Sequence, residues 1–320
     1  MHYDIFNGDA DGICALHQLR LYEPRPEALA ITGVKRDIAL LARAELTGVR
    51  DSGITVLDIS LDSNRQPLME LLAGNNTITY FDHHSAEPIP AAPNLTATIV
   101  LSADTCTSLL VNQALGDRYA RWAVCGAFGD NLHGPAGELA TRISLDADQT
   151  RQLKEIGELF NYNGYGATID DLHFHPLELY RAIARYDDPL RFFQDSEELA
   201  TLRQGYADDM ALALAVKEYP NAGKNRVFFL PDASWARRVS GVFANIKARE
   251  QVESAHALIT ENSDGSLRVS VRAPLADRRD AVTLCKQFPT GGGRAASAGI
   301  NSLPAAMLGD FLDAFNSIYS

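Results

Sequence analysis

Short runs of β-branched and aromatic residues alternate with amphipathic segments through the first third of the chain. The runs predict strands over residues 2–7, 28–34, 54–60 and 77–84. The segments between them predict helices over residues 11–22, 36–46 and 63–74. Strands that alternate with helices in this way favour a parallel sheet covered by helices. The pattern therefore predicts an α/β fold.

A second series of strands and helices begins near residue 225. It predicts strands over residues 225–232, 255–262 and 267–274, and helices over 234–251 and 303–320. A chain of 320 residues is long enough for two domains that each bury a core. We expect an α/β chain with a parallel-sheet N-terminal domain at residues 1–188 and a smaller α/β C-terminal domain at 225–320. A helical linker at 189–224 would join them.

Charge and composition restrict the partners. The 41 Asp and Glu residues outnumber the 29 Lys and Arg residues and give a net charge of -12. This balance argues against a long duplex as partner, whereas a few arginines in a cleft can hold a short or small phosphorylated substrate. No run approaches ~18 apolar residues and the first residues are acidic, so we expect a cytoplasmic protein without membrane association. The sequence leaves a homodimer open, and its scattered cysteines are expected to be reduced.

Aspartate and histidine side chains, which can bind metal ions, lie at the ends of three predicted strands. They are Asp9, Asp11, Asp58, Asp82, His83 and His84. The carboxyl ends of parallel strands line one crevice, so we expect these side chains to converge. Carboxylates held this close would repel one another, and a divalent cation is the simplest compensation. Oxygen and imidazole ligands without thiolates suit Mn2+ or Mg2+, with Zn2+ as a less favoured alternative. Taken alone, Asp11-Gly12 equally suits a turn or a helix N-cap.

Other features of the second half point to phosphate binding. The stretch Thr290 to Gly293 lacks obstructing side chains, and amides at the start of a short helix after it would bind an anion. The alternative for such a run is a mobile turn. A separate segment with Asp171, His173 and His175 offers three side chains on one face of an extended stretch. They would lie near the cleft as further metal ligands; the alternative, which is more frequent for such histidines, is a structural role.

These motifs resemble those of the DHH phosphoesterase family, which includes RecJ-type exonucleases, oligoribonucleases and cyclic-dinucleotide phosphodiesterases. NGDADG is similar to its first motif, VLDIS to the second, FDHH to the third and GAFGDN to the fourth. GGGRAASAG, preceded by SVR, is similar to the DHH-associated C-terminal domain. The resemblance covers essentially the whole chain and implies an active cleft between two domains.

The resemblance also implies the ligands of two metal ions. One site would be built from Asp11, Asp58, His83 and Asp130. The other would use Asp9, share Asp58 and take a histidine at the position that Ile5 occupies here. We therefore expect Mn2+, with Mg2+ as the alternative, at one tight site and one weaker site. His84 and Asp82 are the implied catalytic residues, and His84 would face the substrate phosphate or orient a ligand.

The function that follows is Mn2+-dependent hydrolysis of phosphoester bonds in short oligonucleotides or cyclic (di)nucleotides by a metal-bound hydroxide. Activity would be low if the site beside Ile5 binds its ion weakly. The alternatives are a small-molecule phosphatase of the nucleoside bisphosphate type and a nucleotide-binding regulator with a partly degraded metal site. Substrate would be held in the C-terminal domain, where the family usually has His at the position of Arg294. The substrate-binding residues are Arg272, Gly291, Gly292, Gly293 and Arg294.

Overall fold

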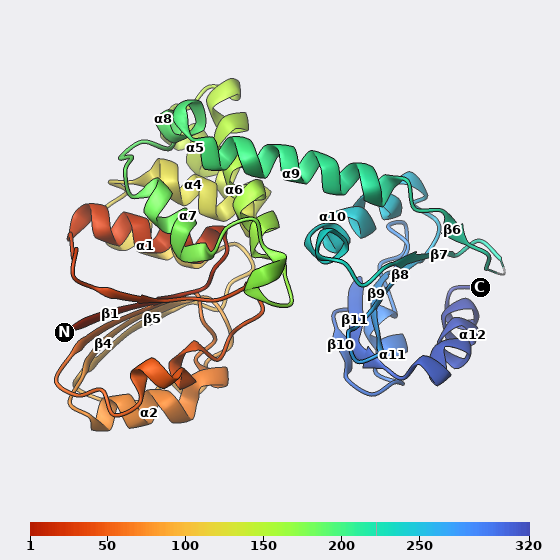
Figure 1. Cartoon of the computed structure of the whole chain (residues 1–320), viewed down its shortest axis with the longest axis horizontal. Coiled ribbons are helices and arrows are strands. Elements are labelled where there is room, and N and C mark those ends of the chain that lie inside the picture. Colours follow the sequence, from red (N-terminus) through yellow and green to blue (C-terminus); the bar gives the residue numbers. More distant parts are fainter. Residues whose placement is uncertain (222) are drawn as a thin grey trace. The chain divides into compact units, whose positions relative to one another are not determined.

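The computed structural model describes residues 1–221 and 223–320 and divides into two compact units, Met1–Gly205 and Tyr206–Ser320 (Figure 1). Each unit pairs a sheet with helices, which confirms the predicted α/β class. The division falls inside helix α9 (Glu197–Leu214), within the predicted linker at 189–224. Ala222, also in that linker, lies outside the described residues. The bounds predicted for the two domains stay a prediction.

The first unit contains a five-stranded parallel sheet in the order β2-β1-β3-β4-β5. Its strands are β1 (His2–Phe6), β2 (Leu29–Ile31), β3 (Gly53–Leu57), β4 (Thr77–Asp82) and β5 (Leu95–Ile99). The first four were predicted, and β5, in which two of the five residues are threonines, was not. The strand order changes direction between β1 and β3, and ligands of open α/β sheets bind at the carboxyl ends of the strands beside such a point.

Helices cover both faces of this sheet, with α2 on one face and α1, α4, α6 and α7 on the other (Figure 1). Successive side chains of β1 point to opposite faces of the sheet. Ile5 packs in the core cluster that includes Leu68 of α2, whereas Phe6 contacts Tyr180 of α7. The helices of this unit are α1 (Ala10–Tyr22), α2 (Arg65–Ala73), α3 (Thr107–Ala114), α4 (Ala120–Gly129), α5 (His133–Arg142), α6 (Ala147–Gly164), α7 (Pro176–Ile183) and α8 (Pro189–Asp195).

The helix predicted over residues 36–46 is wrong. This segment forms two short 3-10 turns, η1 (Leu40–Ala42) and η2 (Ala44–Leu46). The Asn64 side chain accepts from the Leu41 amide at 3.0 Å and donates to the Ile38 carbonyl, so contacts from a distant segment replace helical hydrogen bonds. The leucines still bury themselves against the sheet, which is why the periodicity resembled a helix.

The second unit contains a six-stranded sheet in the order β10-β11-β9-β8-β7-β6. Only β7 and β8 pair in parallel, and the other neighbours are antiparallel. Val227 of β7 joins the core cluster that includes Phe311 of α12, and its neighbour Phe228 packs on Phe243 of α10. The elements are β6 (Glu218–Tyr219), β7 (Arg226–Leu230), α10 (Ser234–Glu250), β8 (His256–Glu261), β9 (Leu267–Arg272), α11 (Ala281–Cys285), β10 (Gly291–Gly293), β11 (Ser297–Leu303) and α12 (Leu308–Ile318).

The glycine run forms an edge strand, and the short helix expected after it is absent. Gly291, Gly292 and Gly293 make up β10, and a tight turn follows in which Arg294 and Ser297 exchange backbone hydrogen bonds of 2.8 and 3.2 Å. Gly293 has a φ of +135°, a backbone conformation that residues with side chains rarely adopt. Glycine at this position therefore permits the hairpin between β10 and β11. The expected anion site at a helix start is therefore not present.

Among residues 1–221 and 223–320, no helix combines the length and apolarity needed to cross a membrane. Cys14, Cys106, Cys125 and Cys285 are all buried free thiols.

His17 of α1 gives the first unit a testable dependence on pH. The residue is 1% exposed, its ring lies against Trp122, and its Nε2 atom is 2.9 Å from the Tyr186 carbonyl oxygen. Burial lowers the pKa of His17 to about 4, so the unfolded chain binds this proton first as the pH falls. We expect the His17 contribution to the free energy of unfolding to drop by about 2 kcal/mol between pH 7 and pH 5.

Urea unfolding at both pH values, compared between the wild type and His17→Gln, measures this contribution. The variant should lose less stability over the interval, because glutamine has no proton to gain. An equal loss in both proteins would contradict the account of His17.

Candidate metal centre

Five aspartates gather at the carboxyl ends of the parallel strands. Asp9 begins α1 after β1, Asp58 follows β3, Asp82 ends β4, Asp11 lies in the first turn of α1, and Asp130 ends α4. We call these five residues the acid cluster. Asp9, Asp11, Asp58 and Asp82 are at most 2% exposed, so the cluster concentrates negative charge where little water reaches it.

The His83 ring lies beside three members of the acid cluster. Its Nε2 atom is 3.3 Å from Asp58 Oδ1, 3.7 Å from Asp130 Oδ2 and 3.9 Å from Asp11 Oδ2. The structure thus brings together the four residues that the resemblance implied for one metal site.

Local backbone structure places Asp58 and its neighbours. Asp58 adopts a left-handed conformation with a φ of 59°, and its amide donates to the Phe81 carbonyl at 3.0 Å. This conformation is rare outside glycine, asparagine and aspartate, and such outliers are frequent at functional sites. In the first motif, a Cβ at Gly12 would approach the Asn7 carbonyl oxygen to 2.2 Å, so only glycine lets the chain turn this tightly into α1.

Backbone amides hold two of the aspartates. Asp11 accepts from the amides of Thr107 and Ser108, both at 2.7 Å, and so caps the start of α3 from a distant helix. Asp9 Oδ1 accepts from the amides of Asp11 and Gly12 and is the N-cap of α1. The capping role considered for this motif is therefore present, with Asp9 capping its own helix and Asp11 another.

Asp82 and His84 form a hydrogen-bonded pair. Asp82 Oδ1 is 2.7 Å from His84 Nδ1, and this contact raises the pKa of His84. The other carboxylate oxygen of Asp82 is buried and has no hydrogen-bond partner among the described residues. Asp58, His83 and His84 each offer one ligand atom, and these atoms lie within 4.8 Å of one another.

Proton affinities in the acid cluster follow from crowding. Burial and the charges of Asp11, Asp9 and Asp130 raise the pKa of Asp58 well above its ordinary value. Burial and the nearby Asp11 raise the pKa of Asp130 to about 6. For Asp130, burial and the neighbouring carboxylates outweigh the opposite effect of Lys35 and His83, so both carboxyls are harder to ionise than an exposed aspartate.

Lys35 is a member of this site that the sequence analysis did not identify. It follows β2, and its Nζ atom is 2.6 Å from Asp9 Oδ2 and 3.7 Å from Asp130 Oδ1. Burial disfavours a charge on Asp9, but the ammonium of Lys35 outweighs it and lowers the pKa of that carboxyl. Its place in the sequence could have indicated this position, because Lys35 directly follows the strand predicted over residues 28–34, just as the aspartates follow theirs.

The residues around His83 fit a divalent cation. An ion about 2.1 Å from each ligand leaves neighbouring ligand atoms roughly 3.0 to 3.5 Å apart. The distance of 3.3 Å from His83 Nε2 to Asp58 lies in this range, and those of 3.7 and 3.9 Å to Asp130 and Asp11 are slightly longer. His84 also offers a ligand atom within 4.8 Å of those of Asp58 and His83. Oxygen ligands with one imidazole, an unpartnered Asp82 oxygen and carboxyls that resist ionisation all suit a hard divalent ion.

Other predicted residues lie apart from this cluster or have structural partners. Ile5 is fully buried in the core cluster on the α2 face of the sheet. His173 contacts the Tyr162 hydroxyl at 2.7 Å, and His175 accepts from the Leu177 amide to cap α7. Arg272 belongs to the second unit, where it donates to Asn245 and Ser270 at 2.9 Å.

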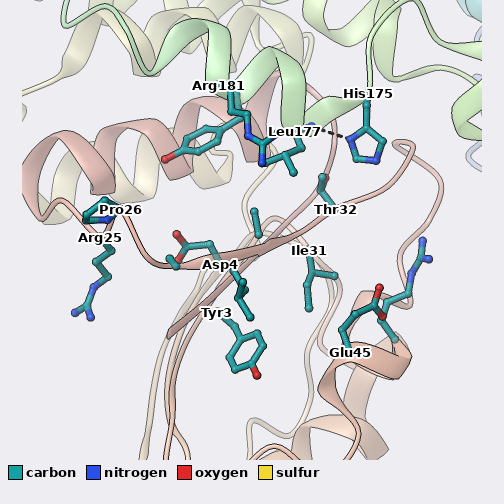
Figure 2. Close-up of a pocket in the computed structure, with 15 residues that line it drawn as sticks. Tyr3, Asp4, Arg25, Pro26, Ile31, Thr32, Glu45, His175, Leu177 and Arg181 are labelled. Atoms are coloured by element: carbon teal, nitrogen blue, oxygen red, sulfur yellow. Dashed lines mark hydrogen bonds between the residues drawn. The ribbon is translucent and has the colours of Figure 1, made fainter. Parts of the chain in front are cut away.

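Figure 2 shows a separate pocket of about 700 Å³ beside the edge strand β2. Arg25, Arg43 and Arg181 are among the residues that line it, and the first two pair with Glu23 and Asp37. No member of the acid cluster lines it, so the candidate metal centre and this pocket are distinct.

No family model and no curated protein sequence matches this chain. Solved structures with the same fold are nevertheless found. A DHH domain from a protein described as belonging to a family of ribosomal proteins is 14% identical, matches 99% of this chain and 86% of its own, and has a TM-score of 0.63. Manganese-bound exonuclease RecJ is 16% identical over 99% of this chain and 89% of its own, with a TM-score of 0.62.

A third structure is PggH from Vibrio cholerae, described as a pGpG-specific phosphodiesterase. It is 12% identical, covers 100% of this chain and 99% of its own, and has a TM-score of 0.59. At such identities the likeness establishes the fold. The chain has the fold of the DHH proteins, and the resemblance carried by its four motifs is confirmed at that level.

Asp58→Asn tests whether the acid cluster is unfavourable without a cation. A carboxyl whose pKa is higher in the folded than in the unfolded protein destabilises the folded state at neutral pH, and asparagine tolerates the same φ. In the presence of a chelator we expect the variant to be about 1 kcal/mol more stable than the wild type in urea unfolding.

Mn2+ should reverse this order. At about a hundredfold excess over its Kd, an ion adds about 3 kcal/mol to the wild type, and the variant should gain little. Asp148→Asn, at an exposed carboxylate of α6, serves as the control and should leave both measurements unchanged. A variant less stable than the wild type in chelator would contradict the account.

Proposed function

We propose that this chain is a metal-dependent phosphoesterase whose centre is built from Asp11, Asp58, His83 and Asp130. The observation that carries the proposal is the position of His83 Nε2, within 3.9 Å of carboxylate oxygens from three separate segments. The DHH fold supports it, because one structure with this fold is described as an exonuclease bound to manganese.

Each residue has a distinct part in the proposed reaction. Asp58, His83 and Asp130, with Asp11, would hold the divalent ion, which when bound lowers the pKa of a water molecule and neutralises charge on the phosphate. The amides of Thr107 and Ser108 fix the orientation of the Asp11 carboxylate. Lys35 keeps Asp9 ionised beside the centre. These contacts hold the ligands in place before substrate arrives.

His84 and Asp82 are proposed to act on the substrate. Asp82 is fully buried and fixes His84 through the 2.7 Å contact to Nδ1. The His84 side chain is 44% exposed, so its remaining ring nitrogen is available to donate to a phosphate oxygen. A buried carboxylate that orients a half-exposed imidazole is an arrangement that suits phosphate binding and proton transfer.

The proposed substrates are short oligonucleotides or dinucleotides. Both the exonuclease and the pGpG-specific phosphodiesterase named above share this fold. The net charge of -12 argues against a long duplex, which needs a broad basic surface. Mn2+ is the proposed cofactor, with Mg2+ as the alternative for the same oxygen-rich ligand set.

Substitution of a ligand should abolish hydrolysis. His83→Ala and Asp82→Ala are expected to lower Mn2+-dependent release of mononucleotide from pGpG or a three-nucleotide RNA by about a hundredfold or more, because each removes a group that holds the ion or orients His84. Chromatographic separation of the products gives the rates.

Asp148→Asn provides the matched control and should retain wild-type rates, because its carboxylate is exposed on α6. Full activity in His83→Ala would refute the assignment of the centre. Release of inorganic phosphate from a nucleoside bisphosphate without cleavage of pGpG would instead favour the phosphatase alternative.

In the second unit, we propose that Arg272, Arg294 and the strand Gly291–Gly293 bind the substrate phosphate or base. Arg272 ends β9 and pairs in register with Ser297, the residue that closes the turn containing Arg294. Both arginines therefore lie at one end of the same sheet. Gly292 adds no side chain to this edge, and a Cβ there would meet nothing within 4 Å.

Arg272→Ala and Arg294→Ala should raise KM about tenfold and leave kcat within about twofold, because they remove binding that is equal in the ground and transition states. Steady-state kinetics on pGpG measures both constants. Arg279→Ala, which removes an exposed guanidinium paired with Asp277, is the control. An unchanged KM in both test variants would exclude these arginines from substrate binding.

A further inference from the structure

Contacts of both the backbone and the side chain fix the position of Lys35 beside the candidate metal centre. Its amide donates to the Gly164 carbonyl at 2.9 Å, and its carbonyl accepts from the Asn7 side chain at 3.3 Å. Its Nζ atom contacts Asn161 Oδ1 at 2.8 Å and lies 5.4 Å from the centre of the Tyr165 ring. With a side chain only 20% exposed, Lys35 is a positioned cation and not a solvated surface charge.

Both carboxylate oxygens of Asp9 have close partners, and one of these partners is a cation, whereas Asp11 is held by neutral amides alone. Oδ1 accepts from the amides of Asp11 and Gly12, and Oδ2 is 2.6 Å from Lys35 Nζ. An ion that bound Asp9 would have to displace the ammonium or approach it against like-charge repulsion. The position of Ile5 supplies no ligand either. Isoleucine has no metal-binding atom, and this side chain packs in the apolar core on the α2 face of the sheet.

Asp130 lies between two cation positions. Its Oδ1 atom is 3.7 Å from Lys35 Nζ, and its Oδ2 atom is 3.7 Å from His83 Nε2. One carboxylate therefore faces the ammonium with one oxygen and the proposed ion site with the other. The negative charge at the Asp9 end of the acid cluster is already compensated, and the charge at the Asp58 end is not.

We propose that Lys35 is the second cation of this centre, and that its ammonium beside Asp9 and Asp130 limits the chain to one divalent ion. The inference rests on the metal centre of the proposed function and concerns how many ions that centre holds. Lys35 is a positioning residue, because it acts by neutralising Asp9 and by orienting Asp130 toward the ion. A centre of this kind has one exchangeable ion and one permanent charge.

The test counts bound Mn2+ in the full-length protein by equilibrium dialysis and elemental analysis, with calorimetric titration to give each Kd. The wild type should bind one ion. Lys35→Met keeps a side chain of similar length without the charge and should bind two, with the second ion about tenfold or more tighter than any second ion in the wild type. Lys35→Arg keeps the charge and should bind one.

The double variant Lys35→Met/Asp9→Asn removes both partners and should bind one ion again. This result would show that the second ion of Lys35→Met depends on Asp9. Lys35→Gln, which can keep a hydrogen bond to Asp9 without the charge, replaces Lys35→Met if that variant folds poorly, as circular dichroism would show, and it should likewise bind two ions. Two ions of equal affinity in the wild type, or one ion in a folded Lys35→Met, would overturn the inference.

The ion count also separates this inference from the proposed function. A wild type that binds one ion, with a Lys35→Met variant that binds two, supports the inference even if no phosphoester is cleaved. A wild type that binds no Mn2+ overturns both the inference and the metal centre.

Discussion

Negative charge buried at the carboxyl end of the parallel sheet is the constraint to which the rest of the first unit responds. The charge of each aspartate in the acid cluster needs a stabilising partner. Three of the five aspartates have such a partner within the chain, each of a different kind. Amides at the start of α3 hold Asp11, the ammonium of Lys35 holds Asp9, and His84 pairs with Asp82. Asp58 and Asp130 are left facing His83, with raised pKa values. The negative charge is thus compensated by the chain at the Asp9 end of the acid cluster. It is not compensated at the Asp58 end, where we place an ion.

The strand order explains why these residues meet. In the order β2-β1-β3-β4-β5 the ends of β1, β3 and β4 are neighbours, so residues from the first, second and third motifs arrive at one edge. Lys35 reaches the same edge from the loop after β2. The positive φ of Asp58 is part of this arrangement, since the strained turn directs its carboxylate toward His83. Sheet topology and local strain together give a preorganised set of ligands.

Much of this organisation could be predicted from the sequence, for identifiable reasons. The apolar runs of β1, β3 and β4 are strong local signals, and their ends locate Asp9, Asp58 and His83. Asp130 lies at the end of α4, far along the chain, and only the resemblance of its motif to a family pointed to it. The segment 36–46 differed from prediction because Asn64, a distant residue, supplies its hydrogen bonds. Lys35 could not be predicted from a pattern of metal ligands, because its part in the site is that of a counter-charge to Asp9.

The central claim is that one divalent ion sits among Asp58, His83 and Asp130 while an ammonium serves Asp9. Anomalous diffraction from crystals grown with Mn2+ tests it most directly, because the manganese signal locates each ion without reference to activity. The account predicts one strong peak within coordination distance of the imidazole of His83, and none beside Asp9. The absence of a peak at His83, or a second peak of equal height at Asp9, would contradict it.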